Sequence, residues 1–316
     1  MTKGPQVKGH GTADPGKAEE PFPWEKPKDA ADDSEALARV RAIMEADSYR
    51  LADQDVDFLE SDHTRGPRLQ LDYLKPELGL RAHGIGHTIV VFGSSRLMEP
   101  NAAHRRLAAA CERLAKEPDD IEVKRAHSVA ERVVANSRYY EVARDFARRV
   151  GRGTERSHGD RVAVMTGGGP GVMEAANRGA FEAGARSIGL NISLPHEQYP
   201  NPYLTPDLCF QFHYFAMRKL HFLLRARALV AFPGGYGTFD ELFETLTLIQ
   251  THKIDPLPVV LVGRKFWSRA VNFDFLAEEG VIAAGDVDLF AMVETAEEIH
   301  THIARWHAAK GKPLLD

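Results

Sequence analysis

Three glycine-rich turns constrain the fold of this chain most strongly, because each follows a short apolar segment and precedes a predicted helix. They occupy residues 93–96 (GSSR), 167–171 (GGGPG) and 233–237 (PGGYG). Short apolar strands that alternate with helices, without hairpin turns, predict a parallel sheet with helices on both faces. The carboxyl ends of parallel strands share one edge, so we expect the three turns to meet where such sheets bind ligands.

The predicted fold class is α/β: a doubly wound, Rossmann-like, mostly parallel sheet with an N-terminal helical extension. Apolar runs predict strands at 88–92, 162–165, 187–192, 208–212, 228–232, 258–262 and 289–293. Helical spacing of apolar residues predicts helices at 101–114, 116–135, 139–150, 172–183, 217–225, from 238, 266–279 and 296–308.

The N-terminal part differs from the rest in composition. Residues 1–33 contain almost no aliphatic side chains, which predicts a disordered tail. Residues 34–85 are expected to form a helical extension, with one helix from Asp33 or Ser34 to about residue 59 and a short helix or arm at 66–82. Residues 86–316 are expected to form one Rossmann-like domain, which contains the three glycine turns.

Composition excludes several classes of protein. A net charge of −5 gives no electrostatic case for binding nucleic acid. Two cysteines, Cys111 and Cys209, are too few for a disulfide framework, and no apolar run is long enough to cross a bilayer. We therefore expect a cytoplasmic protein without a membrane partner. No histidine pair at metal-binding spacing lies near the glycine turns, so we expect no metal and no cofactor.

The glycine turns are suited to binding phosphate, because glycine lets backbone N–H groups approach an anion and a helix N-terminus favours negative charge. The ordinary alternative is a turn that needs glycine only for its geometry. Neither the dinucleotide-binding pattern nor a P-loop is present at the turns. A mononucleotide or a sugar phosphate therefore fits best.

Three motifs together resemble one known family. They are GGGPGVMEA at 167–175, Met217-Arg218-Lys219, and PGGYGTFDE at 233–241. This combination resembles the LOG family of cytokinin riboside 5′-monophosphate phosphoribohydrolases, formerly labelled lysine decarboxylases, in its longer bacterial type. The resemblance covers about residues 86–305 and leaves the N-terminal 85 residues and the stretch 97–135 outside the compact family core.

The resemblance implies hydrolysis of the N-glycosidic bond of a nucleoside 5′-monophosphate, such as AMP or a cytokinin riboside 5′-monophosphate, to a free base and ribose 5-phosphate. It also implies a homodimer or a higher homo-oligomer, with helices near residues 214–250 packing across the two-fold axis. A carrier of a nucleotide or of the molybdenum cofactor is the alternative. The string Thr251-His252-Lys253 is only a faint sign of a pyridoxal-phosphate decarboxylase.

The resemblance assigns catalysis to Glu241 and Arg218. The predicted phosphate- and nucleotide-binding residues are Gly93, Ser94, Gly168, Gly169, Met173, Glu174, Lys219, Gly234, Gly235, Gly237 and Thr238. Each has an ordinary alternative. Thr238 and Glu241 have the spacing of a helix capping box. Arg218 and Lys219 could lie on a solvated helix face, and Met173 could be a core residue.

Two neighbouring features are weaker candidates. His213 and Tyr214 precede the Arg218 helix and are candidates for donating a proton to the leaving base. The polar, proline-containing loop at 195–203 is a candidate for closing over the base, although a surface loop is the default.

Overall fold

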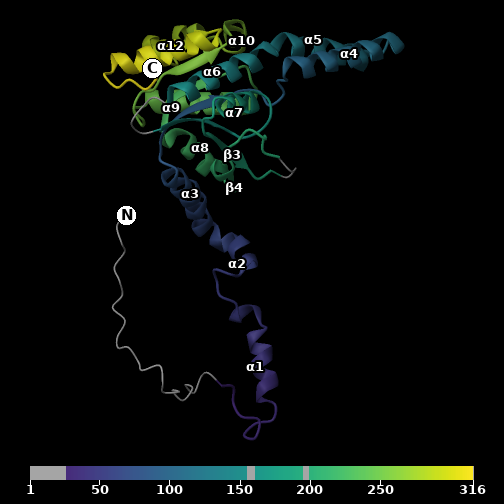
Figure 1. Ribbon diagram of the computed structural model, residues 1–316, viewed down its shortest axis with the longest axis vertical. Coiled ribbons are helices and arrows are strands. Elements are labelled where there is room, and N and C mark those ends of the chain that lie inside the picture. The colour runs from purple at the N-terminus through teal and green to yellow at the C-terminus, as the bar shows by residue number, and fades with distance from the viewer. Residues whose placement is uncertain (1–25, 155–160, 195–198, 316) are drawn as a thin grey trace. The chain divides into compact units, whose positions relative to one another are not determined.

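The computed structural model of the chain describes residues 26–154, 161–194 and 199–315 (Figure 1). The chain divides into two compact units, Met1–Gly66 and Pro67–Asp316. Most of the predicted disordered tail, and residues 195–198 of the predicted loop over the base, lie outside the described residues. Within the described ranges, no helix is long and apolar enough to span a bilayer.

The first unit contains short helices in place of the single helix that the sequence predicts. Helix α1 covers Ala36–Met44, a 3-10 turn follows at Asp47–Tyr49, and α2 covers Val56–Glu60. Helix α2 has its own N-cap, because the Asp55 side chain accepts a hydrogen bond from the Phe58 N–H. The prediction of a single helix to residue 59 is therefore wrong. Glu35 occupies the N-cap of α1 and its side chain makes no capping hydrogen bond, whereas the carboxylate of the predicted cap Asp33 accepts a hydrogen bond from the Glu35 N–H at 3.1 Å.

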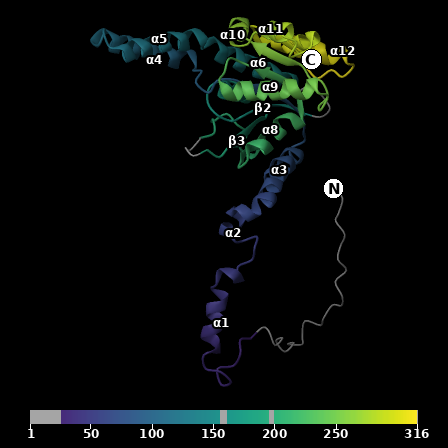
Figure 2. The ribbon, with the colours of Figure 1, turned by 180° about the vertical axis from the view of Figure 1, so that it is seen from behind.

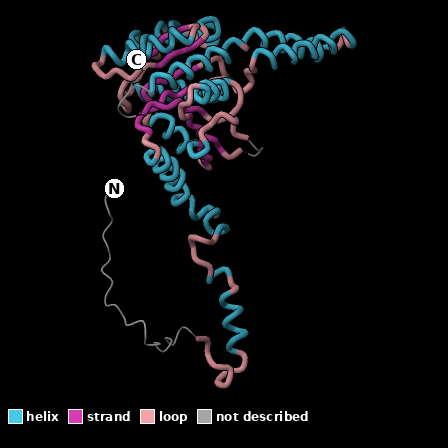
Figure 3. Tube along the Cα trace, viewed as in Figure 1, coloured by secondary structure: helices cyan, strands magenta, loops and turns pink. Residues whose placement is uncertain are grey.

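Seven parallel strands form the sheet of the second unit, in the order β4-β3-β2-β1-β5-β6-β7. Figure 3 shows the strands in magenta among the cyan helices. Every predicted strand is present. Their bounds are β1 Ile85–Phe92, β2 Arg161–Thr166, β3 Ser187–Ile192, β4 Cys209–Phe212, β5 Ala226–Ala231, β6 Val259–Val262 and β7 Phe290–Val293. The order reverses at β1, since β2 pairs on one side of it and β5 on the other.

Helices cover both faces of the sheet, as the alternation of apolar residues requires. Ile89 and Val91 of β1 face a core built with α6 (Arg138–Thr154), α7 (Val172–Glu182) and α12 (Ala296–Ala309). Val90 and Phe92 face the opposite core, with α3 (Arg65–Ala82), α8 (Phe215–Leu224), α9 (Tyr236–Gln250), α10 (Arg264–Ala270) and α11 (Phe273–Glu278) (Figure 2). The predicted two-sided α/β fold is confirmed.

Several helix boundaries differ from the predictions for local reasons. Helix α4 (Pro100–Lys116) packs against α5 (Ile121–Asn136), which begins later than predicted because the Asp120 carboxylate caps its first N–H groups. The predicted helix at 266–279 is two helices, because Asn272 caps α11. Helices α8 and α9 each begin two residues before the predicted start.

A buried ion pair holds α3 against the sheet. Glu77 is only 7% exposed, and its Oε2 accepts a hydrogen bond from the Arg225 guanidinium at 2.6 Å. That hydrogen bond holds the pKa of Glu77 below its usual value. The Arg225 Nε also donates to the Ile85 carbonyl at the start of β1, and the mostly exposed Arg81 lies 2.6 Å from the second carboxylate oxygen. The pair therefore connects helix and sheet.

We expect Arg225→Ala to lower the free energy of unfolding by about 3–5 kcal/mol, because it leaves the Glu77 charge buried without its main partner. Arg81→Ala is the matched control and should cost less than about 1 kcal/mol, since Arg81 is exposed to solvent. Urea denaturation of both variants measures the two values. Equal losses would contradict a special role for the buried pair.

Candidate functional site

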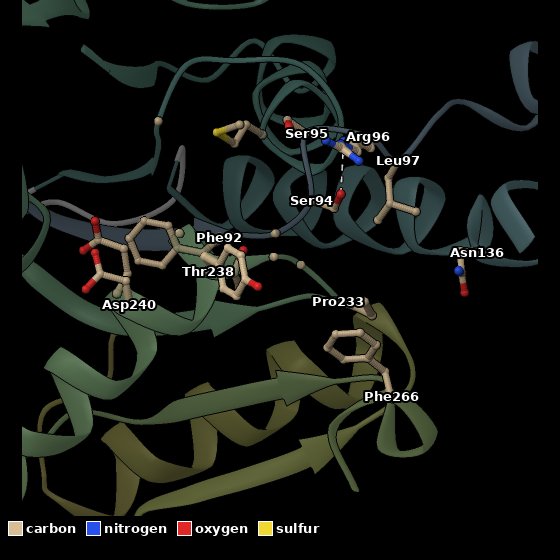
Figure 4. Close-up of a pocket in the computed structure, with 18 of the residues that line it drawn as sticks. Phe92, Ser94, Ser95, Arg96, Leu97, Asn136, Pro233, Thr238, Asp240 and Phe266 are labelled. Atoms are coloured by element: carbon tan, nitrogen blue, oxygen red, sulfur yellow. Dashed lines mark hydrogen bonds between the residues drawn. The ribbon is translucent and has the colours of Figure 1, made fainter. Parts of the chain in front are cut away.

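A pocket of about 750 Å³ lies where the strand order reverses, beyond the carboxyl ends of β1 and β5. The turn after β1 supplies residues 92–97, and the turn after β5 supplies residues 233–238 together with Asp240 and Glu241. The turn after β2 adds Gly167 and Met173, and α8 adds Phe215 and Arg218. The three glycine turns therefore do meet at one site (Figure 4).

The turns hold one another through their backbones. The Ser94 N–H donates to the Pro233 carbonyl at 3.0 Å, and the Ser94 carbonyl accepts from the Val172 N–H at 3.2 Å. A Cβ at Gly93 would lie 2.7 Å from the Val172 side chain, and one at Gly171 would lie 2.3 Å from the Ser94 carbonyl oxygen. Gly171 also has a φ of +76°. These two glycines are needed by the fold itself.

The glycines of the third turn divide into two kinds. A Cβ at Gly234 would collide with the Thr238 side chain, so this residue is required by packing. Gly235 and Gly237 would place a Cβ in open space, and neither has a positive φ. Packing and backbone conformation therefore do not explain these two glycines.

Glu241 is a buried carboxylate inside the pocket. It lies in the second turn of α9 and is 8% exposed. Helix α9 begins at Tyr236 with Gly235 as its N-cap, so Thr238 and Glu241 do not form the capping box that their spacing allowed. Within the described part of the chain no hydrogen bond reaches the Glu241 carboxylate. Burial raises the pKa of Glu241 to about 7, against the opposing effect of Lys219 and Arg218.

Arg218 brings a cation to the same pocket from α8. Its Nε donates to the Leu190 carbonyl at the end of β3 at 2.7 Å, and its guanidinium lies 5.2 Å from the centre of the Phe222 ring. A Cβ at Gly167 would lie 2.5 Å from a terminal nitrogen of this guanidinium, so this glycine makes room for it. Burial lowers the pKa of Arg218, and the Glu241 charge opposes that shift.

Four predicted binding residues do not line the pocket, and two of these, Lys219 and Glu174, are charged. The Lys219 ammonium forms ion pairs with Asp240 at 2.8 Å and with Glu244 at 3.0 Å, which connect α8 to α9. The Glu174 carboxylate accepts a hydrogen bond from the Tyr140 hydroxyl at 2.8 Å. The geometry favours the ordinary structural role for both residues.

Hydrogen bonds with Thr166 and the buried Asn201 fix the conformation of the second turn. Gly168 has a φ of +72°, and its N–H donates to the Thr166 hydroxyl. The Asn201 backbone N–H donates to the Gly168 carbonyl, and the Asn201 side chain donates to the Gly169 carbonyl. Gly168 and Gly169 therefore shape the turn, while Gly167 and Met173 reach the pocket.

His213 and Tyr214 are anchored by their backbones rather than placed in the pocket. Both N–H groups donate to the Asp72 carboxylate of α3, at 2.9 and 2.8 Å. Neither side chain lines the pocket. The geometry thus gives no support to the prediction that one of them protonates the leaving base.

The remaining pocket wall comes from residues that the motifs did not indicate. Val133 and Asn136 of α5, Leu97, Phe215 and Phe266 line it. In Figure 4 the labelled Asp240 lies at one end, whereas Asn136 and Phe266 lie at the other. The sequence signal for these residues is weak: each lies shortly after a predicted strand or near the end of a predicted helix, and none belongs to a recognised motif. Among the described residues, no group of three or more His, Cys, Asp or Glu side chains could hold a metal ion.

Comparisons with known proteins agree with the motifs. The model of a family described as "Possible lysine decarboxylase" matches residues 173–303. A rice (Oryza sativa subsp. japonica) protein named "Probable cytokinin riboside 5′-monophosphate phosphoribohydrolase LOGL3" is 27% identical over 172 residues, which are 51% of this chain and 74% of the relative. The Arabidopsis thaliana cytokinin riboside 5′-monophosphate phosphoribohydrolase LOG3 is 29% identical over 140 residues, 43% of this chain and 63% of that protein.

Solved structures include the molybdenum cofactor carrier protein of Chlamydomonas reinhardtii, with a TM-score of 0.40 and 20% identity over 70% of this chain and 98% of that one. The resemblance to the LOG family that the three motifs predicted is therefore confirmed by the family model and by curated relatives, at modest sequence identity.

Proposed function

We propose that this protein hydrolyses the N-glycosidic bond of a nucleoside 5′-monophosphate, releasing the free base and ribose 5-phosphate. AMP and a cytokinin riboside 5′-monophosphate are the candidate substrates. The observation that carries the proposal is the joint position of Glu241, Arg218 and the 233–238 turn around one pocket. The family resemblance supports the reaction class.

The 5′-phosphate belongs at the third turn in this proposal. Gly235 and Gly237 leave their backbone exposed to the pocket at the N-terminus of α9, where the helix dipole favours an anion. Ser94, on the adjoining turn, adds a hydroxyl. A phosphate bound there places the ribose toward the second turn of α9, which carries Glu241.

Glu241 is proposed to act on the ribose carbon. Breaking the C1′–N bond develops positive charge on the ribose, which a nearby carboxylate stabilises. The carboxylate also accepts a proton from the water whose oxygen bonds to C1′. A pKa of about 7 suits this role, because a substantial fraction is ionised at neutral pH while its basicity remains high.

Arg218 is proposed to orient the sugar. Its Nε is occupied by Leu190, whereas no other hydrogen bond of its guanidinium occurs within the described residues. The terminal nitrogens are thus available for ribose hydroxyls or phosphate oxygens. A carrier function requires the phosphate site but not a buried carboxylate beside the sugar, so hydrolysis is favoured over binding alone.

We also propose that the protein assembles as a homodimer or larger homo-oligomer in the cytoplasm. Helices α8 and α9 expose five large apolar side chains, Phe215, Leu220, Leu224, Tyr236 and Phe243. Phe215 and Tyr236 also line the pocket. A second copy covering α8 and α9 would therefore exclude water from the site as well as bury this surface.

We expect Glu241→Gln to reduce the rate of adenine release from AMP by at least about a hundredfold, since a general base typically contributes a factor of that size. Wild-type activity should rise with pH and level off above about 7, as the carboxylate ionises. Chromatography of released adenine measures both effects. AMP binding without adenine release by the wild type would favour the carrier function.

The same substitution should affect stability in the opposite direction. Because the folded state raises the pKa of Glu241 from 4.5 to about 7, ionisation destabilises the wild type as the pH rises through this interval. The stability of Glu241→Gln relative to the wild type should therefore increase between pH 5 and 8, by up to about 3 kcal/mol. Thermal denaturation at both pH values tests this. If the difference in stability between the two proteins does not change with pH, the Glu241 carboxylate is exposed to solvent and the prediction is wrong.

The substitution Gly237→Ala distinguishes a role of this glycine in ligand binding from a role in the stability of the fold. Alanine at this helical position should leave stability unchanged or raise it by about 0.5–1 kcal/mol. Its methyl group would enter the phosphate site and weaken binding of ribose 5-phosphate at least about tenfold, or 1.4 kcal/mol. Calorimetric titration measures binding. Gly285→Ala, which also adds a methyl group in open space but outside the pocket, is the control.

The assembly is tested by the double variant Leu220→Glu and Leu224→Glu. Burying two carboxylates would cost several kcal/mol, so this variant should elute as a monomer while the wild type does not. Val281→Glu adds a charge at another exposed apolar residue and should leave the mass unchanged. Light scattering gives the mass of each protein. A wild-type monomer would disprove the proposed assembly.

A further inference from the structure

A second cluster of reactive side chains lies outside the pocket, on the hairpin of α4 and α5. The Cys111 sulfur of α4 lies 3.3 Å from Nε2 of His127 on α5. The other ring nitrogen, Nδ1, lies 3.8 Å from a carboxylate oxygen of Glu131. A nucleophile, a base and a carboxylate are thus arranged in sequence.

The hairpin explains why these side chains meet. His127 and Glu131 are four residues apart, which places them on the same face of α5. Cys111 is exposed, and the residues three before and four after it, Ala108 and Ala115, have the smallest side chains available. A reagent in solvent can therefore approach the sulfur along α4.

The geometry allows transfer of the thiol proton to the imidazole. If the thiol donates to Nε2, the neutral imidazole carries its own hydrogen on Nδ1, on the side of Glu131. The carboxylate then stabilises the positive charge that the ring acquires when it takes the thiol proton.

We propose that Cys111 is a modification site that undergoes thiol–disulfide exchange with low-molecular-weight disulfides such as oxidised glutathione. His127 accepts the thiol proton, and Glu131 is a positioning residue for the imidazole. This site is independent of the proposed hydrolase activity.

The step balances without a further reagent. The Cys111 S–H proton passes to His127 Nε2, and the sulfur attacks one sulfur of the glutathione disulfide. A new S–S bond forms to Cys111 and the disulfide bond of glutathione breaks. The departing glutathione thiolate takes up the proton, so the protein thiol is oxidised and one glutathione is reduced.

Cys209 provides an internal comparison in the same molecule. It lies at the start of β4, is half-buried, and burial raises the pKa of its thiol. Because the thiolate is the attacking species, Cys209 should react slowly. The proposal therefore predicts selective modification of Cys111 in the folded protein.

The test uses the full-length folded protein with oxidised glutathione at neutral pH, and mass spectrometry of peptides follows each cysteine over time. Cys111 should form the mixed disulfide at least about tenfold faster than Cys209. His127→Gln should slow Cys111 by at least about tenfold, and Glu131→Gln by a smaller factor. His104→Gln, which removes an imidazole from α4 two turns away from Cys111, is the matched control and should change neither rate.

Two results would overturn the proposal. One is a Cys111 rate in His127→Gln within twofold of the wild type, which would make Cys111 an ordinary exposed thiol. The other is faster modification of Cys209 than of Cys111 in the wild type. An unchanged rate in Glu131→Gln would remove the positioning role of Glu131. All readouts are independent of nucleotide hydrolysis.

Discussion

The backbone of the turn after β1 touches both other glycine turns, and the geometry of the pocket depends on these contacts. Ser94 donates to Pro233 on one side and accepts from Val172 on the other. Such close approach is sterically available only because Gly93 and Gly171 lack side chains. The reversal of strand order between β1 and β5 opens the space, and the turns then form its floor.

This arrangement places a buried carboxylate, that of Glu241, in the lining of the pocket. Glu241 loses solvation without gaining a hydrogen bond among the described residues, so its pKa rises to about 7. A residue with only a structural role would more easily be apolar at this depth. Functional sites commonly carry such unfavourable groups, and burial of the two apolar cores on either face of the sheet supplies the stability that offsets them.

The hairpin of α4 and α5 contributes to two separate features, the wall of the pocket and the cluster around Cys111. Its end near Val133 and Asn136 contributes to the pocket wall, although it lies outside the segment that the family model matches. Its middle carries Cys111 and His127. The matched segment contains the 233–237 turn, Arg218 and Glu241, whereas the residues of α5 that line the far pocket wall lie before it.

The sequence by itself determined the sheet and the turns, because strand alternation and glycine requirements are local properties that periodicity reports directly. It also indicated Glu241 and Arg218 through their motif, yet left Glu241 divided between a helix cap and a site residue. The tertiary structure excluded the helix cap by beginning α9 at Tyr236. It also paired Lys219 with acidic residues of α9, brought α5 to the pocket and broke the predicted helices at 34–59 and 266–279. These outcomes depend on contacts between residues far apart in the chain and on caps that compete with helix continuation, which apolar spacing alone does not encode.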